Sequence, residues 1–155
     1  MLLVVIAGFI LAVTPFVAEK FFPVPENTLR VAKPEAASRA LKQWFGSPDA
    51  LFSGVQAISK SSIDKEKNIE KRTSWFAFSV GRRAVEKYII KHKLQQTELS
   101  DKLLKEIFYT ENRPASWWQP EALSQKTFFS GEDQGRKVAL IYNPDSKRGV
   151  LVTHN

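Results

Sequence analysis

The segment SVGRR, residues 79–83, combines residue types that suit the binding of an anion. An expected strand ends at its glycine and an expected helix begins, so free backbone N–H groups and the positive end of the helix dipole would point at a ligand. Arg82 and Arg83 add positive charge, and Lys87 and Lys91 continue one helical face from Arg83 at four-residue spacing. We therefore predict an anion- or lipid-binding site at Arg82, Arg83, Lys87 and Lys91. The alternative is that water and salt alone compensate the positive charge of these side chains at the start of the helix.

The same segment does not resemble a nucleotide-binding loop. Neither G-x-x-x-x-G-K-[ST] nor G-x-G-x-x-G accompanies it. The formal net charge of +7 would suit a nucleic acid, but the chain has no recognisable nucleic-acid-binding module and begins with an apolar run. We therefore expect no nucleic-acid partner, and the nature of any small-molecule ligand stays open.

Metal and thiol chemistry have little support in the composition. The chain has no cysteine and two histidines, and no H-x-H or H-E-x-x-H spacing occurs. His92 stands among lysines on the outer face of an expected helix, so we expect it to be exposed to solvent, and His154 reads as a residue of the C-terminal tail. These patterns predict neither a metal site nor a cofactor.

The hydroxyl and carboxylate residues do not form a recognisable catalytic motif either. Ser79 and Ser130 lie close to glycines at expected strand ends, outside a G-x-S-x-G context. Glu132 and Asp133 are adjacent in an expected tight turn, where acidic residues are common for conformational reasons. We assign no catalytic residue and keep an envelope-associated hydrolase with an unlocated active site as an alternative.

Aromatic residues supply the candidate interfaces. The segment RPASWWQP, residues 113–120, places Trp117 and Trp118 side by side, and adjacent residues of an extended segment point to opposite sides. We therefore expect one tryptophan to pack in the core and the other to be available to a partner. Phe21 and Phe22 are further interface candidates, because they follow the N-terminal apolar run and could reach the membrane surface.

That apolar run, residues 2–18, contains no charged side chain. As a helix it would be roughly 25 Å long, slightly shorter than a hydrocarbon core of about 30 Å. A cleaved signal peptide fits less well, because no basic residue precedes the run and Phe16 would occupy the −3 position of the cleavage site. The pattern predicts an uncleaved single-pass anchor at residues 1–18, with the lipid bilayer as a partner.

The side of the membrane is less determined. Lys20, Arg30 and Lys33 follow the run, and by the positive-inside rule they would place the C-terminal domain in the cytoplasm. An apolar segment at the extreme N-terminus followed by a large domain more commonly exports that domain. We favour an exported domain, periplasmic or extracellular, with the cytoplasm as the alternative.

The elements that must position these residues follow the anchor. Pro23 and Pro25 predict an extended spacer at residues 19–33, and residues 34–155 have the length of one domain. Pro34 suits the first position of a helix that ends at Gly46. Further expected helices cover 81–94 and 100–108, with one helical turn at PEAL.

Alternating apolar residues predict the strands. Residues 50–59 and 73–80 would form a hairpin with a long mobile loop at 60–72, and residues 126–131, 136–142 and 149–154 would form a three-stranded meander. The predicted fold class is α+β: a two-layer domain with an antiparallel sheet of about five strands and helices packed on one face.

Together these features predict a non-catalytic, single-pass membrane-anchored accessory or scaffold subunit of a membrane protein complex. A membrane protein would then be its partner. Besides the hydrolase, the second alternative is a module that binds an anionic lipid or polymer through the basic helix at 82–93.

Overall fold

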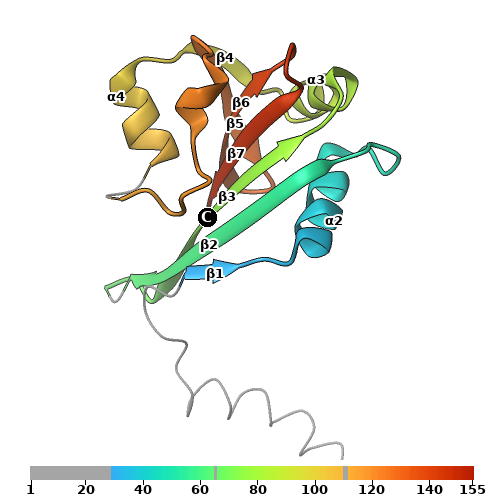
Figure 1. Cartoon of the computed structure of the whole chain (residues 1–155). Helices are drawn as coiled ribbons and strands as arrows, with labels where there is room; N and C mark the ends of the chain where they lie inside the picture. The colour runs from blue at the N-terminus through green and yellow to red at the C-terminus, as the bar shows by residue number, and fades with distance from the viewer. Residues whose placement is uncertain (1–28, 65, 110–111) are drawn as a thin grey trace, which may run out of the picture.

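A seven-stranded antiparallel sheet runs through the part of the chain that the computed structural model describes, residues 29–64, 66–109 and 112–155 (Figure 1). The strands lie in the order β1-β2-β3-β7-β6-β5-β4. Their bounds are Leu29–Val31 (β1), Ser53–Asp64 (β2), Ile69–Ser79 (β3), Gln95–Glu98 (β4), Thr127–Asp133 (β5), Arg136–Asn143 (β6) and Arg148–His154 (β7). The helical elements are α2 (Pro34–Phe45), α3 (Arg82–Lys91), α4 (Asp101–Leu103), η1 (Leu104–Phe108) and η2 (Pro120–Leu123).

The helices and the C-terminal meander lie where the sequence predicts them. Helix α2 begins at Pro34 and ends at Gly46, which adopts a left-handed φ of 60°. The Ser100 hydroxyl accepts a hydrogen bond from the Leu103 N–H and so caps α4, which continues into η1. The α+β class and the antiparallel sheet are thus confirmed.

The expected number of strands was wrong, because two edge strands give no periodic signal. Strands β1 and β4 have exposed side chains throughout. A strand with neither face buried shows no alternation of apolar and polar residues, so its sequence cannot be distinguished from a loop. The three residues of β1 lie within the expected spacer and pair with residues 58–60 of β2.

The expected mobile loop at 60–72 was also wrong. Strand β2 continues to Asp64 and β3 starts at Ile69, so the two strands pair as one long hairpin up to that point. Lys71 Nζ lies 2.9 Å from the Asp64 carboxylate and joins the strands across the ladder. Most of the described charged residues of this stretch are exposed, while Lys60 and Asp64 are half-buried. The hydrogen bonds of the strand ladder therefore order this stretch, although its sequence has no apolar face.

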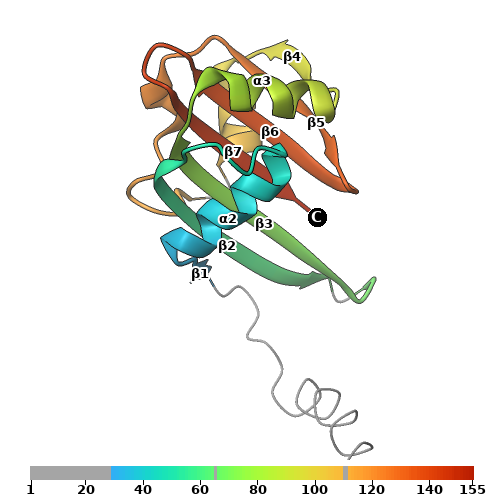
Figure 2. The same ribbon diagram turned by 90° about the vertical axis from the view of Figure 1, so that its right-hand side faces the viewer.

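Both faces of the sheet are covered, whereas the sequence predicted helices on one face only. One apolar core lies between the sheet and α2 and α3, and a second lies against α4, η1 and η2. Figure 1 shows α4 on one side of the strands and α2 and α3 on the other, and Figure 2 shows α2 and α3 in front of the strands. The central strands require this arrangement, because they have apolar side chains on both faces. Trp75 and Phe76, for example, are consecutive and both buried, and they point to opposite faces of the sheet.

The expected membrane anchor (1–18), Phe21 and Phe22 lie outside the described residues, as does most of the expected spacer. Within residues 29–64, 66–109 and 112–155, no helix is long and apolar enough to cross a membrane.

Candidate functional site: a cationic pocket

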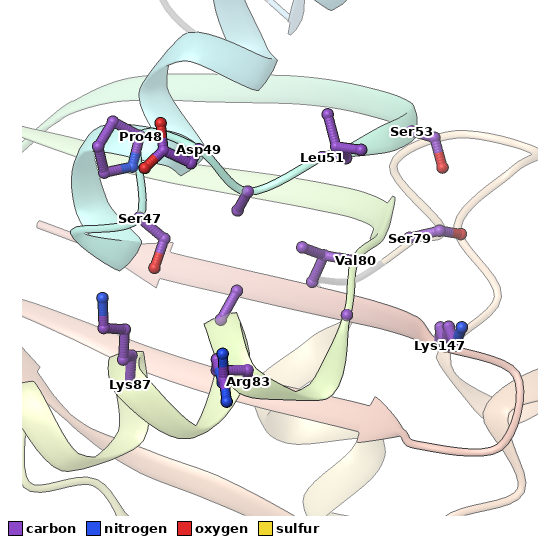
Figure 3. A pocket seen from close by; sticks show the side chains of 13 residues that line it. Ser47, Pro48, Asp49, Leu51, Ser53, Ser79, Val80, Arg83, Lys87 and Lys147 are labelled. Carbon is purple, nitrogen blue, oxygen red and sulfur yellow. The ribbon is translucent and has the colours of Figure 1, made fainter.

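A pocket of about 680 Å³ opens between the end of α2 and the start of α3 (Figure 3). Three stretches that are distant in sequence form it: the α2–β2 connection up to the start of β2, the end of β3 with the first turns of α3, and the β6–β7 turn. We call it the cationic pocket, and its lining residues are Ser47, Pro48, Asp49, Ala50, Leu51, Ser53, Ser79, Val80, Gly81, Arg83, Ala84, Lys87 and Lys147.

The C-terminus of α2 forms one wall. The N–H groups of Gly46 and Ser47 donate to the carbonyls of Gln43 and Lys42, which satisfies the last turn of the helix and reverses the chain. The Ala50 N–H donates to the Ser47 carbonyl at 3.0 Å and tightens the turn. The glycine that the sequence identifies as a helix stop therefore sets the direction of the pocket's rim.

Two hydrogen bonds hold the opposite wall. The Tyr142 hydroxyl donates to the Val80 carbonyl at 2.8 Å, and the Val80 N–H donates to the Lys147 carbonyl at 2.9 Å. Tyr142 is buried, and burial raises the pKa of its hydroxyl, so it remains a donor. These bonds fix the β6–β7 turn beside the end of β3 and bring Lys147 to the pocket.

The pocket carries an excess of positive charge. Arg83, Lys87 and Lys147 line it together with one acidic residue, Asp49. Among the described residues, none of these three cations has an ionic partner within 4.0 Å. The N-cap of α3, Gly81, provides no side-chain cap, and the described first turn of α3 contains no acid. Free N–H groups and the helix dipole therefore add to the charge of the side chains.

The four basic residues singled out from the sequence do not share one site. Arg83 and Lys87 line the pocket and lie on α3 facing the α2–β2 connection in Figure 3. Arg82 is not among the lining residues and pairs with Glu86, its Nε 2.7 Å from the carboxylate. Lys91 lies at the other end of α3, where its Nζ is 3.5 Å from the Trp44 carbonyl at the C-terminal end of α2.

Lys147 was missed because it is far from α3 in sequence. Its position follows from strand pairing: β7 is antiparallel to β3, and Arg148 pairs with Ser79. The turn before β7 therefore lies at the end of β3, where α3 begins. The basic turn residue was visible in the sequence, but the pairing that places it was not.

His92 occupies a buried contact, and its expected exposure was wrong. Its side chain is 11% exposed, its Nδ1 lies 3.3 Å from the Asp133 carboxylate, and its Nε2 lies 3.3 Å from the Trp44 carbonyl. Arg136 also pairs with Asp133 at 3.2 Å and lies over the Trp44 ring. His92 follows the last turn of α3, and the left-handed residue Lys93 turns the chain back toward the sheet. The cluster joins α2, α3 and the β5–β6 turn.

His154 is likewise part of the fold rather than a free tail. It lies in β7 opposite Thr73, and its Nδ1 is 3.1 Å from the Thr73 hydroxyl. Burial is the main cause that lowers the pKa of His154 below its ordinary value, and the charge of Lys137 acts in the same direction.

The two tryptophans have different environments. Trp118 is fully buried, and its Nε1 donates to the Phe108 carbonyl at 2.7 Å. Trp117 is half-buried and meets the Trp118 ring edge to face. The segment before them is tied to η2, because Arg113 pairs with Glu121 at 2.8 Å and Tyr109 donates to the same carboxylate. Burial raises the pKa of Tyr109 to about 12, which keeps its hydroxyl protonated as the donor.

Within the part of the chain that the structure describes, no group of three or more His, Cys, Asp or Glu residues could hold a metal ion. Comparisons with known proteins found no matching family model, no similar curated protein and no similar solved structure.

Proposed function

We propose that the chain is a non-catalytic, membrane-anchored accessory domain that holds an acidic group of a partner protein in the cationic pocket. The observation that supports this proposal most directly is the convergence of Arg83, Lys87 and Lys147 on one pocket. The anchor in the proposal is the uncharged run at residues 2–18.

The pocket combines the two surfaces that an acidic side chain needs. Its volume of about 680 Å³ lies within the range of roughly 300–1,000 Å³ that is usual for ligand pockets. Pro48, Leu51, Val80 and Ala84 provide apolar contact for a hydrocarbon stem, while the three cations provide charge-assisted hydrogen bonds to a carboxylate.

The position of the pocket favours a protein partner over a lipid headgroup. The described chain begins at Leu29, which pairs with Lys60 of β2, whereas Ser53 at the start of β2 lines the pocket. At about 3.3 Å per residue, this stretch of β2 separates the two points by roughly 23 Å. A chain anchored through its N-terminus therefore presents the pocket away from the point where the anchor joins the domain.

A peptide titration tests the proposal. A glutamate-rich peptide added to the full chain at low salt should shift the NMR signals of the pocket-lining amides. Reversing the pocket charges with Arg83→Glu, Lys87→Glu and Lys147→Glu should abolish those shifts and weaken binding at least tenfold, because it replaces attraction with repulsion.

A matched variant separates the pocket from the overall charge. Lys105→Glu, Lys126→Glu and Lys137→Glu remove the same amount of positive charge at exposed positions that do not line the pocket. This variant should keep most of the affinity. Equal losses in the two triple variants would show attraction to net charge alone and would contradict the proposed site.

A further inference from the structure

The β2–β3 hairpin extends beyond the rest of the sheet. Strand β1 pairs only with residues 58–60 of β2, and β7 pairs with β3 only from Thr73 onward. Residues 62–64 and 69–71 therefore pair only with each other among the described strands, and Ser61 pairs with Arg72. We call residues 61–64 and 66–71 the hairpin tip. Figure 1 shows the tip as a projection at one end of the molecule, beside the start of β1.

Two exposed isoleucines lie on opposite faces of the hairpin tip. Ile63 is 41% exposed and Ile69 is 54% exposed. Alternation along each strand places Ile63 on the face of Ala57, which packs toward α2, and Ile69 on the face of Trp75, which packs in the other core. A flat protein surface would cover only one of these faces. A hairpin end immersed in a lipid headgroup layer would cover both.

The hairpin tip lies at the end of the domain where the described chain begins. Leu29, the first residue of β1, pairs with Lys60, directly before the tip, and is itself 48% exposed. The uncharged run at residues 2–18 precedes this point in the chain. A bilayer that holds the run would therefore be connected to the domain at the end that carries the tip.

The charges of the hairpin tip fit a membrane surface without requiring an anionic one. Residues 61–71 contain three lysines and three acidic residues, so this stretch has no formal net charge. Lys67 is exposed and can reach lipid phosphates, whereas Lys71 pairs with Asp64. Burial of apolar surface, at about 25 cal/mol per Å², is then the driving force, and the charged side chains stay at the level of the headgroups.

We propose that the hairpin tip inserts Ile63 and Ile69 at the boundary between headgroups and acyl chains of the bilayer in which the N-terminal run is anchored. The inference depends on the membrane anchor of the proposed function. Insertion of the tip would fix the orientation of the domain, with the cationic pocket directed away from the membrane. Ser53 and the pocket lie at the opposite end of β2, roughly 36 Å from Asp64 at about 3.3 Å per residue.

Single-cysteine labelling tests this contact cleanly, because the chain contains no cysteine. The full chain carrying Lys67→Cys, labelled with an environment-sensitive fluorophore, is reconstituted into phosphatidylcholine vesicles with and without phosphatidylglycerol. Spin-labelled lipid should quench this label several-fold more strongly than a label at Ser146→Cys, an exposed position in the β6–β7 turn at the pocket end. Adding Ile63→Ser and Ile69→Ser should abolish the difference, because both substitutions remove apolar surface that is already exposed and should leave the fold intact.

Alkaline extraction of the same vesicles distinguishes the possible failures. A chain that resists extraction but whose Lys67 label is no better quenched than the Ser146 label overturns the tip contact and leaves the anchor. If the fluorescence of the Lys67 label shifts to the blue but is not quenched by spin-labelled lipid, the label contacts protein, and this result also overturns the inference. A chain that alkali extracts overturns both the anchor and the tip contact, since the second depends on the first. Quenching that requires phosphatidylglycerol would contradict insertion through the isoleucines.

Discussion

At the scale of single residues, burial separates side chains that are neighbours in sequence. Trp118 has no exposed surface and donates its indole N–H to a backbone carbonyl at the end of η1, so it closes the core beneath η1 and η2. Trp117 packs at the border of the same core and keeps part of its ring exposed. Of the two, Trp117 is therefore the residue that a partner could contact, and Trp118 carries the larger share of the stability.

Replacing each tryptophan by alanine tests this difference. Trp118→Ala should lower the free energy of unfolding by about 3–5 kcal/mol, because it leaves a large cavity and an unpaired carbonyl at Phe108. Trp117→Ala should cost clearly less, since its ring already contacts solvent. Urea unfolding followed by circular dichroism measures both, and equal losses would contradict the assignment of Trp118 to the core.

His154 predicts a pH dependence of stability. Burial lowers its pKa in the folded chain below the ordinary value of 6.5, so below that value the unfolded chain binds more protons than the folded chain. The stabilisation is present above about pH 6.5 and is lost as the pH falls toward the lower folded pKa.

The comparison that isolates this effect uses His154→Gln, which retains a hydrogen-bonding group opposite Thr73. Urea midpoints are measured at about pH 7.5 and about pH 5.5. The wild-type chain should lose more stability on acidification than the variant, because the remaining titrating groups are common to both. Identical losses would show that His154 does not contribute.

At the scale of elements, the N-terminus of α3 has neither a side-chain cap nor an acidic residue in its first turn. Gly81 has φ −63° and ψ 145°, which any residue can adopt, and a Cβ added there meets no atom within 4 Å. The glycine is therefore not required by the backbone, and its effect is to leave the end of α3 open to the pocket.

Gly81→Asp should fill this position from within the chain. Its carboxylate would accept hydrogen bonds from the free N–H groups of α3 and raise the free energy of unfolding by about 0.3–1 kcal/mol. The same carboxylate would compete with the glutamate-rich peptide, so binding should weaken at least tenfold. Gly81→Ala is the matched control and should keep the binding; an aspartate variant that still binds would argue against a ligand at this helix end.

At the scale of the whole molecule, the long β2–β3 hairpin separates two surfaces. The hairpin tip lies beside the start of β1, and the cationic pocket lies at the other end of β2. With the proposed anchor at one end and the proposed binding pocket at the other, this arrangement would suit the holding of a partner at a distance from a membrane.

Fractionation tests the anchor on which this arrangement depends. The full chain should sediment with membranes and resist alkaline extraction, because the uncharged run at residues 2–18 would lie in the hydrocarbon core. Deleting residues 1–18 should move the chain to the soluble fraction with an unchanged circular dichroism spectrum. Release of the full chain by alkali would contradict a spanning anchor.

Local physical chemistry in the sequence determined α2, α3, the capped helix after Ser100 and the C-terminal meander. Apolar periodicity, a proline at a helix start, a left-handed glycine and a serine cap each act within a few residues, so they can be read without knowing the fold. Only the tertiary structure decided the rest. Edge strands β1 and β4 and the hairpin tip bury no face and give no periodic signal. The position of Lys147 depends on the pairing of β7 with β3, and that of His92 on a carboxylate 41 positions later in the chain. Such contacts join residues that are distant in sequence, so the packing of the sheet and its helices determines them.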